Sequence, residues 1–279
     1  MLKQNQYKNL FLVVVMLGLA GCAQKTAIVM QGYEKGALLK FNFIPGQTLK
    51  YRQTTETSIT MEYKGVPQTW YTTTELTTTK TVVDTGEITT VTMNFDNASG
   101  ISRMNDEMKN IKEMEEVNGK SITFKFSREG KITETKGIKD TDYFKNQEKQ
   151  LISQFEESIG LLPNKVVKQG ESWQRKTEDA TATYTLKGFE QKNNIDCARI
   201  EGIEKGAYTE NVDIREGKGK VKLNTTTKST TFFAIKDGII LESKTTTSAE
   251  GEQEFVKDTG ESMKMPIYMD MKIRTQLIH

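Results

Sequence analysis

The sequence is poor in the residues that catalysis and metal binding use most. Histidine occurs once among the 279 residues, as the terminal His279, so no internal imidazole is available to activate a serine or to help hold zinc. Catalysis by carboxylates alone stays open, but no spacing of Asp and Glu typical of a calcium loop or a glycosidase pair supports it. We therefore expect no catalytic residues, no metal site, no cofactor and no enzymatic activity.

An excess of charge of one sign is also absent. The 39 Lys and Arg residues nearly balance the 37 Asp and Glu residues, which leaves a net charge of +2. A protein that neutralises a phosphate backbone carries clustered positive charge. Nucleic acid is therefore not an expected partner.

The one long apolar run lies near the N-terminus, over residues 10–20, after the basic residues Lys3 and Lys8. It is shorter than the roughly 20 apolar residues that a membrane-spanning helix needs. Basic residues followed by a short apolar stretch and small residues are typical of a secretory signal peptide. A transmembrane anchor or a buried apolar strand is the alternative interpretation.

The end of this run, Leu19-Ala20-Gly21-Cys22, resembles the bacterial lipobox. The resemblance implies that residues 1–21 are a signal peptide, cleaved before Cys22, and that acyl chains such as palmitate modify the cysteine. Acyl chains contribute about 0.8 kcal/mol per buried methylene, so several of them hold a protein on a membrane. Ala23 stands where an Asp would favour inner-membrane retention. The resemblance thus implies a lipid-anchored protein of the bacterial cell envelope, at the outer membrane and facing the periplasm.

The second cysteine, Cys197, has no disulfide partner once Cys22 carries lipid. It lies in the expected strand "NNIDCARIEG". A small buried hydrophobe is the first interpretation of Cys197, and a nucleophile is the second.

Threonine clusters in tracts such as "YTTTELTTTKT", which apolar residues interrupt at every second position. Thr is β-branched and favours strands, and period-two alternation is typical of antiparallel strands with one buried and one wet face. Disordered low-complexity sequence or a glycosylated stalk is the alternative. The last such stretch, Ser262–Ile278, predicts a strand of about 50 Å at ~3.3 Å per residue. Strands this long predict a broad, curving sheet.

Two helices are expected to cover that sheet. Residues 140–160 place five apolar residues on one helical face before Gly160 and Pro163 end the pattern, and residues 104–119 place three more at helical spacing. The expected fold class is α+β: a large curved antiparallel sheet, half-barrel-like, covered by one or two helices. The apolar residues are Phe144, Leu151, Ile152, Phe155 and Ile159 in the first helix, and Met104, Met108 and Ile111 in the second.

The mature chain divides into a lipidated N-terminus and tether, residues 22–36, and a single β-rich domain, residues 37–279. "SREGKITETK" from Ser127 and "IKDGIILESK" from Ile235 share a hairpin pattern with Gly at a left-handed position. Two duplicated halves, residues 37–160 and 161–279, are one interpretation of this similarity. Independent use of the same hairpin chemistry is the other.

Two Asp-Thr-Gly motifs, at residues 84–86 and 258–260, resemble the paired motifs of aspartic proteases, where two carboxylates share a proton. Glu87 and Glu261 follow them, however, and would add negative charge where those enzymes have a small neutral residue. Asp and Gly are also common turn residues. We interpret both motifs as hairpin turns.

Methionines occupy alternate positions of the last expected strand, at Met263, Met265, Met269 and Met271. Ordinary core packing is one interpretation. The other depends on the flexible, polarizable thioether, which fills irregular space and tolerates varied neighbours. A Met-lined curved sheet under helices would admit acyl chains or another apolar ligand. These four methionines are our candidate ligand-binding residues.

The segment "LLPNKVVKQGESWQRK", residues 161–176, resembles a Leu-Pro-x-Lys-x-Val-x-x-Gly-x-Ser-Trp signature. That signature recurs in an uncharacterised family of bacterial secreted β-rich proteins and lipoproteins. The order of strands and helices is also similar, in architecture alone, to the lipoprotein-localisation factors, whose half-barrel sheet binds acyl chains. Neither resemblance supplies catalytic residues.

These patterns favour a non-enzymatic, lipid-anchored envelope protein that binds an apolar ligand or a lipoprotein in a cavity between sheet and helices. The alternative is an envelope interaction module that binds a protein or glycan partner through its Thr-rich sheet face.

Overall fold

Strands form most of the described chain, as the alternating pattern predicts. The computed structural model describes residues 32–63, 65–104, 107–128, 130–145, 148–177, 179–214, 217–257 and 262–278. The predicted signal peptide, the lipobox with Cys22, and His279 lie outside these residues. Within them, the β structure consists of one large antiparallel sheet of twelve strands and a small sheet of two.

The large sheet contains seven strands of sixteen residues or more and five shorter ones. Its strands are β2 (Thr48–Tyr63), β3 (Val66–Asp84), β4 (Ile88–Met104), β5 (Glu107–Asn110), β6 (Ser121–Ser127), β7 (Ile132–Lys136), β9 (Ser172–Lys176), β10 (Ala180–Lys192), β11 (Ile195–Ile214), β12 (Gly217–Ala234), β13 (Ile239–Lys257) and β14 (Ser262–Ile278). β14 has the bounds that the sequence predicts. The small sheet pairs β1 (Ala37–Leu38) with β8 (Val166–Val167).

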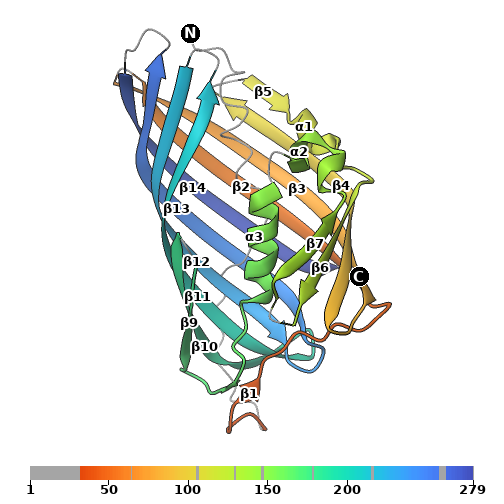
Figure 1. Cartoon of the computed structure of the whole chain (residues 1–279). Helices are drawn as coiled ribbons and strands as arrows, with labels where there is room; N and C mark the ends of the chain where they lie inside the picture. The colour runs from red at the N-terminus through yellow and green to blue at the C-terminus, as the bar shows by residue number, and fades with distance from the viewer. Residues whose placement is uncertain are drawn as a thin grey trace.

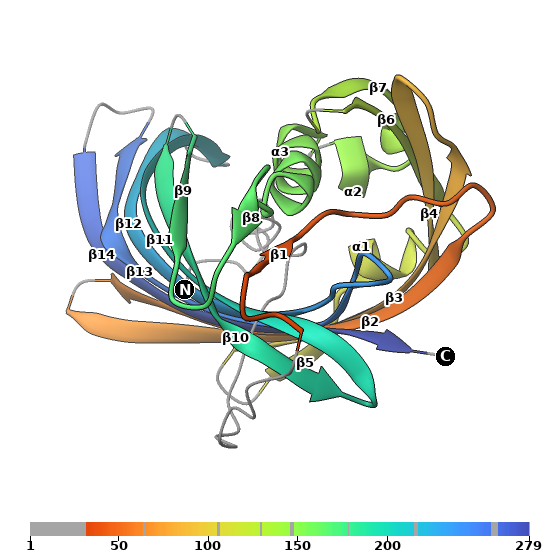
Figure 2. The same cartoon turned by 90° about the horizontal axis from the view of Figure 1, so that it is seen from below.

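Two antiparallel meanders meet at the centre of the large sheet, where β2 pairs with β14. The spatial order is β7-β6-β4-β3-β2-β14-β13-β12-β11-β10-β9, with β5 paired to β4. The edge strands β7 and β9 do not pair with each other, so the sheet is open. Strand twist, which accumulates over long strands, bends the sheet so that one face is concave (Figures 1 and 2).

The fold is mainly β rather than α+β, which corrects the predicted class. Helical segments are short: α1 (Lys112–Glu115), α2 (Asp142–Lys145), α3 (Glu148–Ile159) and a 3-10 turn at Ile138–Asp140. They do not cover the sheet as expected. α3 lies inside the concave side and packs near one edge, beside β6 and β7 (Figure 2).

The predicted helix over residues 104–119 is wrong for most of its length. β4 continues to Met104, and β5 pairs back onto it with Ile101 opposite Asn110. Met108 is 65% exposed, so the apolar spacing that suggested a helix is not used for burial. The strand β4 offers ladder hydrogen bonds to this segment, and tertiary pairing overrides its local helical pattern.

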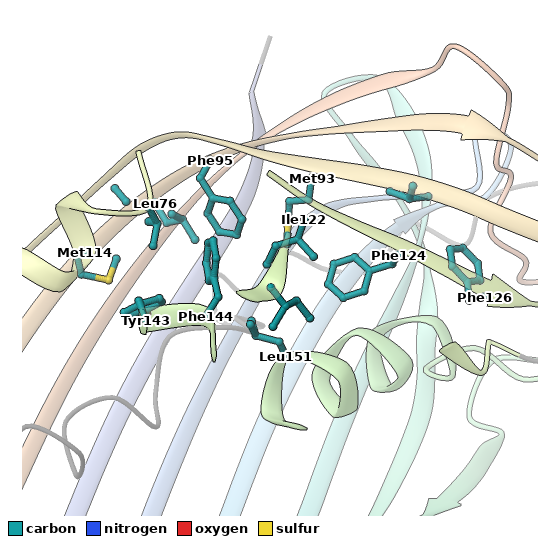
Figure 3. Close-up of a cluster of buried hydrophobic side chains, with 14 of the residues drawn as sticks. Leu76, Met93, Phe95, Met114, Ile122, Phe124, Phe126, Tyr143, Phe144 and Leu151 are labelled. Carbon is teal, nitrogen blue, oxygen red and sulfur yellow. The ribbon is translucent and has the colours of Figure 1, made fainter. Parts of the chain in front are cut away.

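The predicted helix over residues 140–160 is confirmed as α2 and α3. The side chain of Thr141 accepts a hydrogen bond from the backbone N–H of Phe144 at 3.1 Å and caps α2. The apolar face of α3 packs on β4 and β6: the Phe155 ring stacks on Phe124, with 4.1 Å between ring centroids. Phe144 packs against Phe95, and Leu151 faces the same cluster (Figure 3).

A second apolar cluster forms where residues 33–43 cross the concave side. The ring of Tyr33 stacks on Phe189 of β10, with 4.8 Å between centroids. Phe41 contacts Phe233 of β12 edge-on, and Phe43 contacts Phe126 of β6. We call residues 33–43 the strap, because they connect the β10–β12 side of the sheet to the β6 side.

The two predicted hairpin glycines adopt left-handed backbone. Gly130 has φ +82° between β6 and β7, and Gly238 has φ +66° between β12 and β13. A Cβ at Gly238 would lie 2.4 Å from the backbone nitrogen of Asn42 in the strap. Glycine at 238 therefore permits both the turn and the approach of the strap.

Replacing Phe95 with alanine should lower the free energy of unfolding by about 3–5 kcal/mol, the usual cost of a large cavity in a core. Phe95 is 1% exposed and packs against Phe144. Tyr268→Ala is the control, because Tyr268 is 53% exposed, and its change should stay within about 0.5 kcal/mol. Urea unfolding followed by circular dichroism measures both. Equal losses for the two variants would contradict the burial described here.

Candidate functional site on the concave face

The alternation of side chains gives the large sheet an inner, concave face and an outer face. Residues paired directly across antiparallel strands lie on the same face. Met265 and Met269 of β14 pair with Gln253 and Ala249 of β13, and Met269 also pairs with Ile59 of β2. All four candidate methionines lie on this inner face. Met265 is 2% exposed, whereas Met263, Met269 and Met271 are half-buried.

The inner face has apolar zones at its two ends and a band of small hydroxyl side chains between them. At the end where β14 begins, Trp70, Met61 and Ile267 form a buried cluster. At the other end lie the clusters beneath α3 and the strap. The hydroxyl band consists of Thr55, Thr57, Thr72, Thr74, Thr225, Thr227, Thr245 and Thr247.

Charge is nearly absent from the inner face of the six central strands, β2, β3, β4, β12, β13 and β14. Over the described inward positions of these strands, Lys80 is the one charged residue. The outer face differs: along β14 alone it carries Lys264, Asp270, Lys272 and Arg274. The inward positions were followed through the strand register over residues 51–61, 68–82, 91–104, 221–233, 243–255 and 263–277.

A cavity of about 70 Å³ lies between α3 and the sheet at the position of Lys80. Apolar side chains from β3, β4, β6 and α3 form most of its wall, and Met93, Phe124 and Leu151 face one another there (Figure 3). The cavity is too small to enclose a whole acyl chain, because sites for drug-sized ligands hold roughly 300–1,000 Å³. Its lining is Tyr51, Gln53, Leu76, Thr78, Lys80, Met93, Phe124, Leu151, Gln154, Phe155, Ser158 and Thr275.

The ammonium of Lys80 has an aromatic neighbour and no described counterion. Its Nζ lies 5.2 Å from the centre of the Tyr51 ring, which is within cation–π range. Burial lowers the pKa of Lys80, and it forms no ion pair with any residue that the structure describes. The Tyr51 hydroxyl donates a hydrogen bond to the carbonyl of Ile240 at 3.1 Å, and burial raises the pKa of Tyr51. The cavity therefore holds one positive charge in apolar surroundings.

Two further groups of charged residues lie outside this cavity. On the outer face, the buried carboxylate of Glu242 forms ion pairs with Lys192, Lys244 and Arg274, so its charge is compensated. At the C-terminal end of α3, burial raises the pKa values of Glu157 in its last turn and of Glu204 in β11, and the negative charge of Glu157 raises that of Glu204 further.

The other residues singled out in the sequence do not assemble a reaction centre. Asp84 lies in the β3–β4 hairpin, where its carboxylate accepts a hydrogen bond from the backbone N–H of Thr85. Residues 258–260 lie outside the described residues, but the strands that flank them, β13 and β14, meet at the opposite end of the sheet from Asp84. Cys197 is buried, and burial raises its pKa to about 12. A thiol held in this protonated form fits the interpretation of a small buried hydrophobe.

Sequence reasoning did not find Lys80 or the cavity. A signal for Lys80 was present, because it follows Leu76 and Thr78 and precedes Val82 at period two, which places a lysine among buried positions of β3. The cavity depends on where α3 packs, which no local pattern encodes.

Among the described residues, no group of three or more His, Cys, Asp or Glu side chains is placed to hold a metal ion. Within the same residues, no helix combines the length and the apolar character that a membrane-spanning helix requires.

Comparisons with known proteins identify a partial family match and a similar fold. The model of a family of unknown function, DUF6263, matches residues 144–240, which run from α2 to the β12–β13 hairpin. No curated protein matches the chain.

Among solved structures, a lipovitellin chain has 11% identity and a TM-score of 0.52, and the match covers 85% of this chain and 26% of the lipovitellin chain. The chain thus spans about a quarter of that protein's length, and at this identity the likeness concerns the fold alone. DynF from Micromonospora chersina (7% identity, TM-score 0.22, 92% of each chain) and OccK5 from Pseudomonas aeruginosa (7%, 0.23, 84% of this chain and 99% of that one) are also similar, more weakly.

Replacing Lys80 with methionine should raise the free energy of unfolding near pH 7, because the change removes a half-buried cation that has no ion-pair partner among the described residues. Folding lowers the pKa of Lys80, so the unfolded chain binds more protons than the folded chain until the pH passes the unfolded pKa of about 10.4. The stability cost of Lys80 is therefore fully present below its folded pKa and is lost as the pH rises toward about 10.4. Urea unfolding at pH 7 and near pH 11 measures this difference.

The matched control for this prediction is Lys272→Met on the outer face of β14, where the side chain is exposed. Its effect on stability should be small at both pH values. An advantage of Lys80→Met that stays the same at both pH values would contradict the assignment of a half-buried, uncompensated charge.

Proposed function

We propose that the chain is a lipid-anchored bacterial envelope protein without enzymatic activity, and that the inner face of its sheet binds the hydrocarbon chain of an apolar ligand. The lipobox at Cys22 supports the anchor. The four methionines of β14 that line the inner face support the ligand site. An acyl chain is the ligand class that this surface fits best.

One observation carries the proposal: the inner face of six central strands is almost free of charge and yet is not fully covered. Met263, Met269 and Met271 are half-buried there, although solvated sheet faces normally carry charged residues, as the outer face of β14 does. An apolar surface that remains accessible in a folded chain is typical of a binding site. The flexible methionine side chains suit a ligand with no fixed shape.

The likeness to lipovitellin supports the same conclusion at the level of the fold. The structure that matches concerns lipid–protein interactions in lipovitellin. In this chain the sheet is large, open and antiparallel, and its concave side carries the methionines. The architecture of lipoprotein-localisation factors, noted from the sequence, supports an acyl ligand in the same way.

The proposal includes no chemical reaction. The chain has one histidine, at its terminus, and the thiol of Cys197 is buried with a raised pKa. Binding of a partner through the outer face is the second candidate. Exposed tyrosines favour it: Tyr71 and Tyr268 are 45% and 53% exposed on that face, and Arg103 lies 4.9 Å from the Tyr71 ring.

Lipid attachment should depend on Cys22 and not on Cys197. Cells that express the chain and receive radiolabelled palmitate should incorporate label into the wild-type protein, and Cys22→Ser should lose it, because the thiol that accepts the lipid is gone. Cys197→Ala is the matched control and should keep the label, since Cys197 is buried. Label that persists in Cys22→Ser would refute the proposed anchor.

The inner face should bind a long-chain hydrocarbon probe. In isolated membranes that contain the full chain, a photoreactive long-chain alcohol should form adducts on inner-face residues of β14, located by peptide mass spectrometry. Met271→Asp should reduce these adducts about tenfold, because an ionised carboxylate is costly to bury against an alkyl chain.

The control for this experiment is Lys272→Asp, which places the same carboxylate at the next residue, on the outer face. It should leave inner-face labelling unchanged. Adducts confined to the outer face, or equal losses in the two variants, would exclude the inner face as the binding surface.

A further inference from the structure

The further inference concerns the head of the ligand and rests on the proposed function. The inner face of the six central strands offers a ligand a long uncharged surface with a single cation at one end, Lys80. None of the described residues that line the cavity around Lys80 is acidic. A neutral ligand would leave this charge uncompensated, whereas a ligand with one negative charge would pair with it.

The other polar groups around Lys80 are suited to an anion. Gln154 and Ser158 of α3 face the cavity from the side opposite the sheet, and Thr78 and Thr275 line it from β3 and β14. Amide and hydroxyl groups can donate hydrogen bonds to a carboxylate, and bonds to a charged acceptor are the stronger ones. The Ser158 hydroxyl already donates to the carbonyl of Phe155, and the Thr275 hydroxyl to the side-chain oxygen of Gln53. Among the described lining residues, the Gln154 amide and the Thr78 hydroxyl are therefore the donors that lie with the Lys80 ammonium inside an apolar wall.

The size of the cavity and its single charge decide which anion fits. A cavity of about 70 Å³ accommodates a small head group but not a glycerol backbone with two acyl chains. One lysine neutralises one negative charge. A monocarboxylate satisfies both conditions, because it is the smallest anionic head that a single hydrocarbon chain carries.

Beyond the cavity, uncharged inner-face side chains continue along the seam between β14 and β2. Thr275 of the cavity pairs with Gln53, and the next inward pairs along the seam are uncharged. From Thr275 to Met269 the strand covers about 20 Å at ~3.3 Å per residue. The pairs along this seam are Ile273 with Thr55, Met271 with Thr57, and Met269 with Ile59.

We propose that the cavity at Lys80 receives the carboxylate of a free long-chain fatty acid, whose hydrocarbon chain extends along the β2–β14 seam toward Met271 and Met269. Lys80 holds the head as an ion pair, and the side-chain amide of Gln154 in α3 donates a hydrogen bond to it. An anion beside Lys80 also removes the cost of burying an isolated ammonium, which favours its protonated form.

The test compares two photoreactive probes of equal length in isolated membranes that contain the full chain and are washed free of ATP and coenzyme A: a fatty acid and the corresponding alcohol. The acid should label inner-face peptides about tenfold more strongly than the alcohol, as expected for a charge-assisted interaction. Lys80→Met should reduce labelling by the acid to the level of the alcohol. Lys272→Met, on the outer face, should change neither.

The outcomes separate the two proposals. If acid and alcohol label the inner face equally, and Lys80→Met changes neither, the fatty-acid assignment is overturned while hydrocarbon binding stands. If neither probe labels the inner face, the proposed function fails and the assignment fails with it. Stronger labelling by a photoreactive phospholipid than by the acid would overturn the choice of a monocarboxylate. Urea unfolding of Lys80→Met shows that any loss of labelling occurs in a folded protein.

Discussion

The register of the central strands is the constraint on which the rest of the molecule depends. Side chains alternate between faces with a period of two, so a slip of one residue between β2 and β3 would move every inward side chain of β3 to the outer face. Lys80 would then leave the cavity, and Trp70 would leave its buried cluster. Apolar burial at both ends of the strands opposes such a slip, because Leu76 and Val82 at one end and Trp70 at the other are each at most 4% exposed.

Sequence patterns predicted the strands and helices whose pattern lies within one short stretch of sequence. The alternation over Ser262–Ile278 predicted β14 with its observed bounds, and five apolar residues at helical spacing predicted α3. The helix predicted over residues 104–119 does not form over most of that range. Met104 and Ile111 fit a helical period, but the backbone of β4 pairs with this segment as a strand. The amount of helical cover was overestimated for a related reason: helix length can be read from the sequence, but the area of sheet that a helix contacts cannot.

The candidate site was likewise predicted from the sequence only in part. Alternation alone placed Met263, Met265, Met269 and Met271 on one face, and the structure confirms that arrangement, while their role in binding stays a prediction. Lys80 was missed because its neighbours Thr77, Thr79 and Thr81 make the tract resemble a wet face. Its significance depends on the inward positions of five other strands, which together show that it has no charged neighbour. That is a property of the register across strands distant in sequence.

If Cys22 carries lipid as proposed, the strap would determine which end of the sheet lies nearest to the membrane. With lipid on Cys22, eleven residues lead to Tyr33, and they can reach at most about 40 Å when fully extended. Tyr33 packs on Phe189, at the end of the sheet that also carries Ser243, Thr275 and Lys80. Under the proposed anchor, the end with the lysine cavity would lie on the bilayer side, and the cluster around Trp70 would lie on the far side. A single-chain lipid that leaves the bilayer would meet Lys80 before it meets the far end of the sheet.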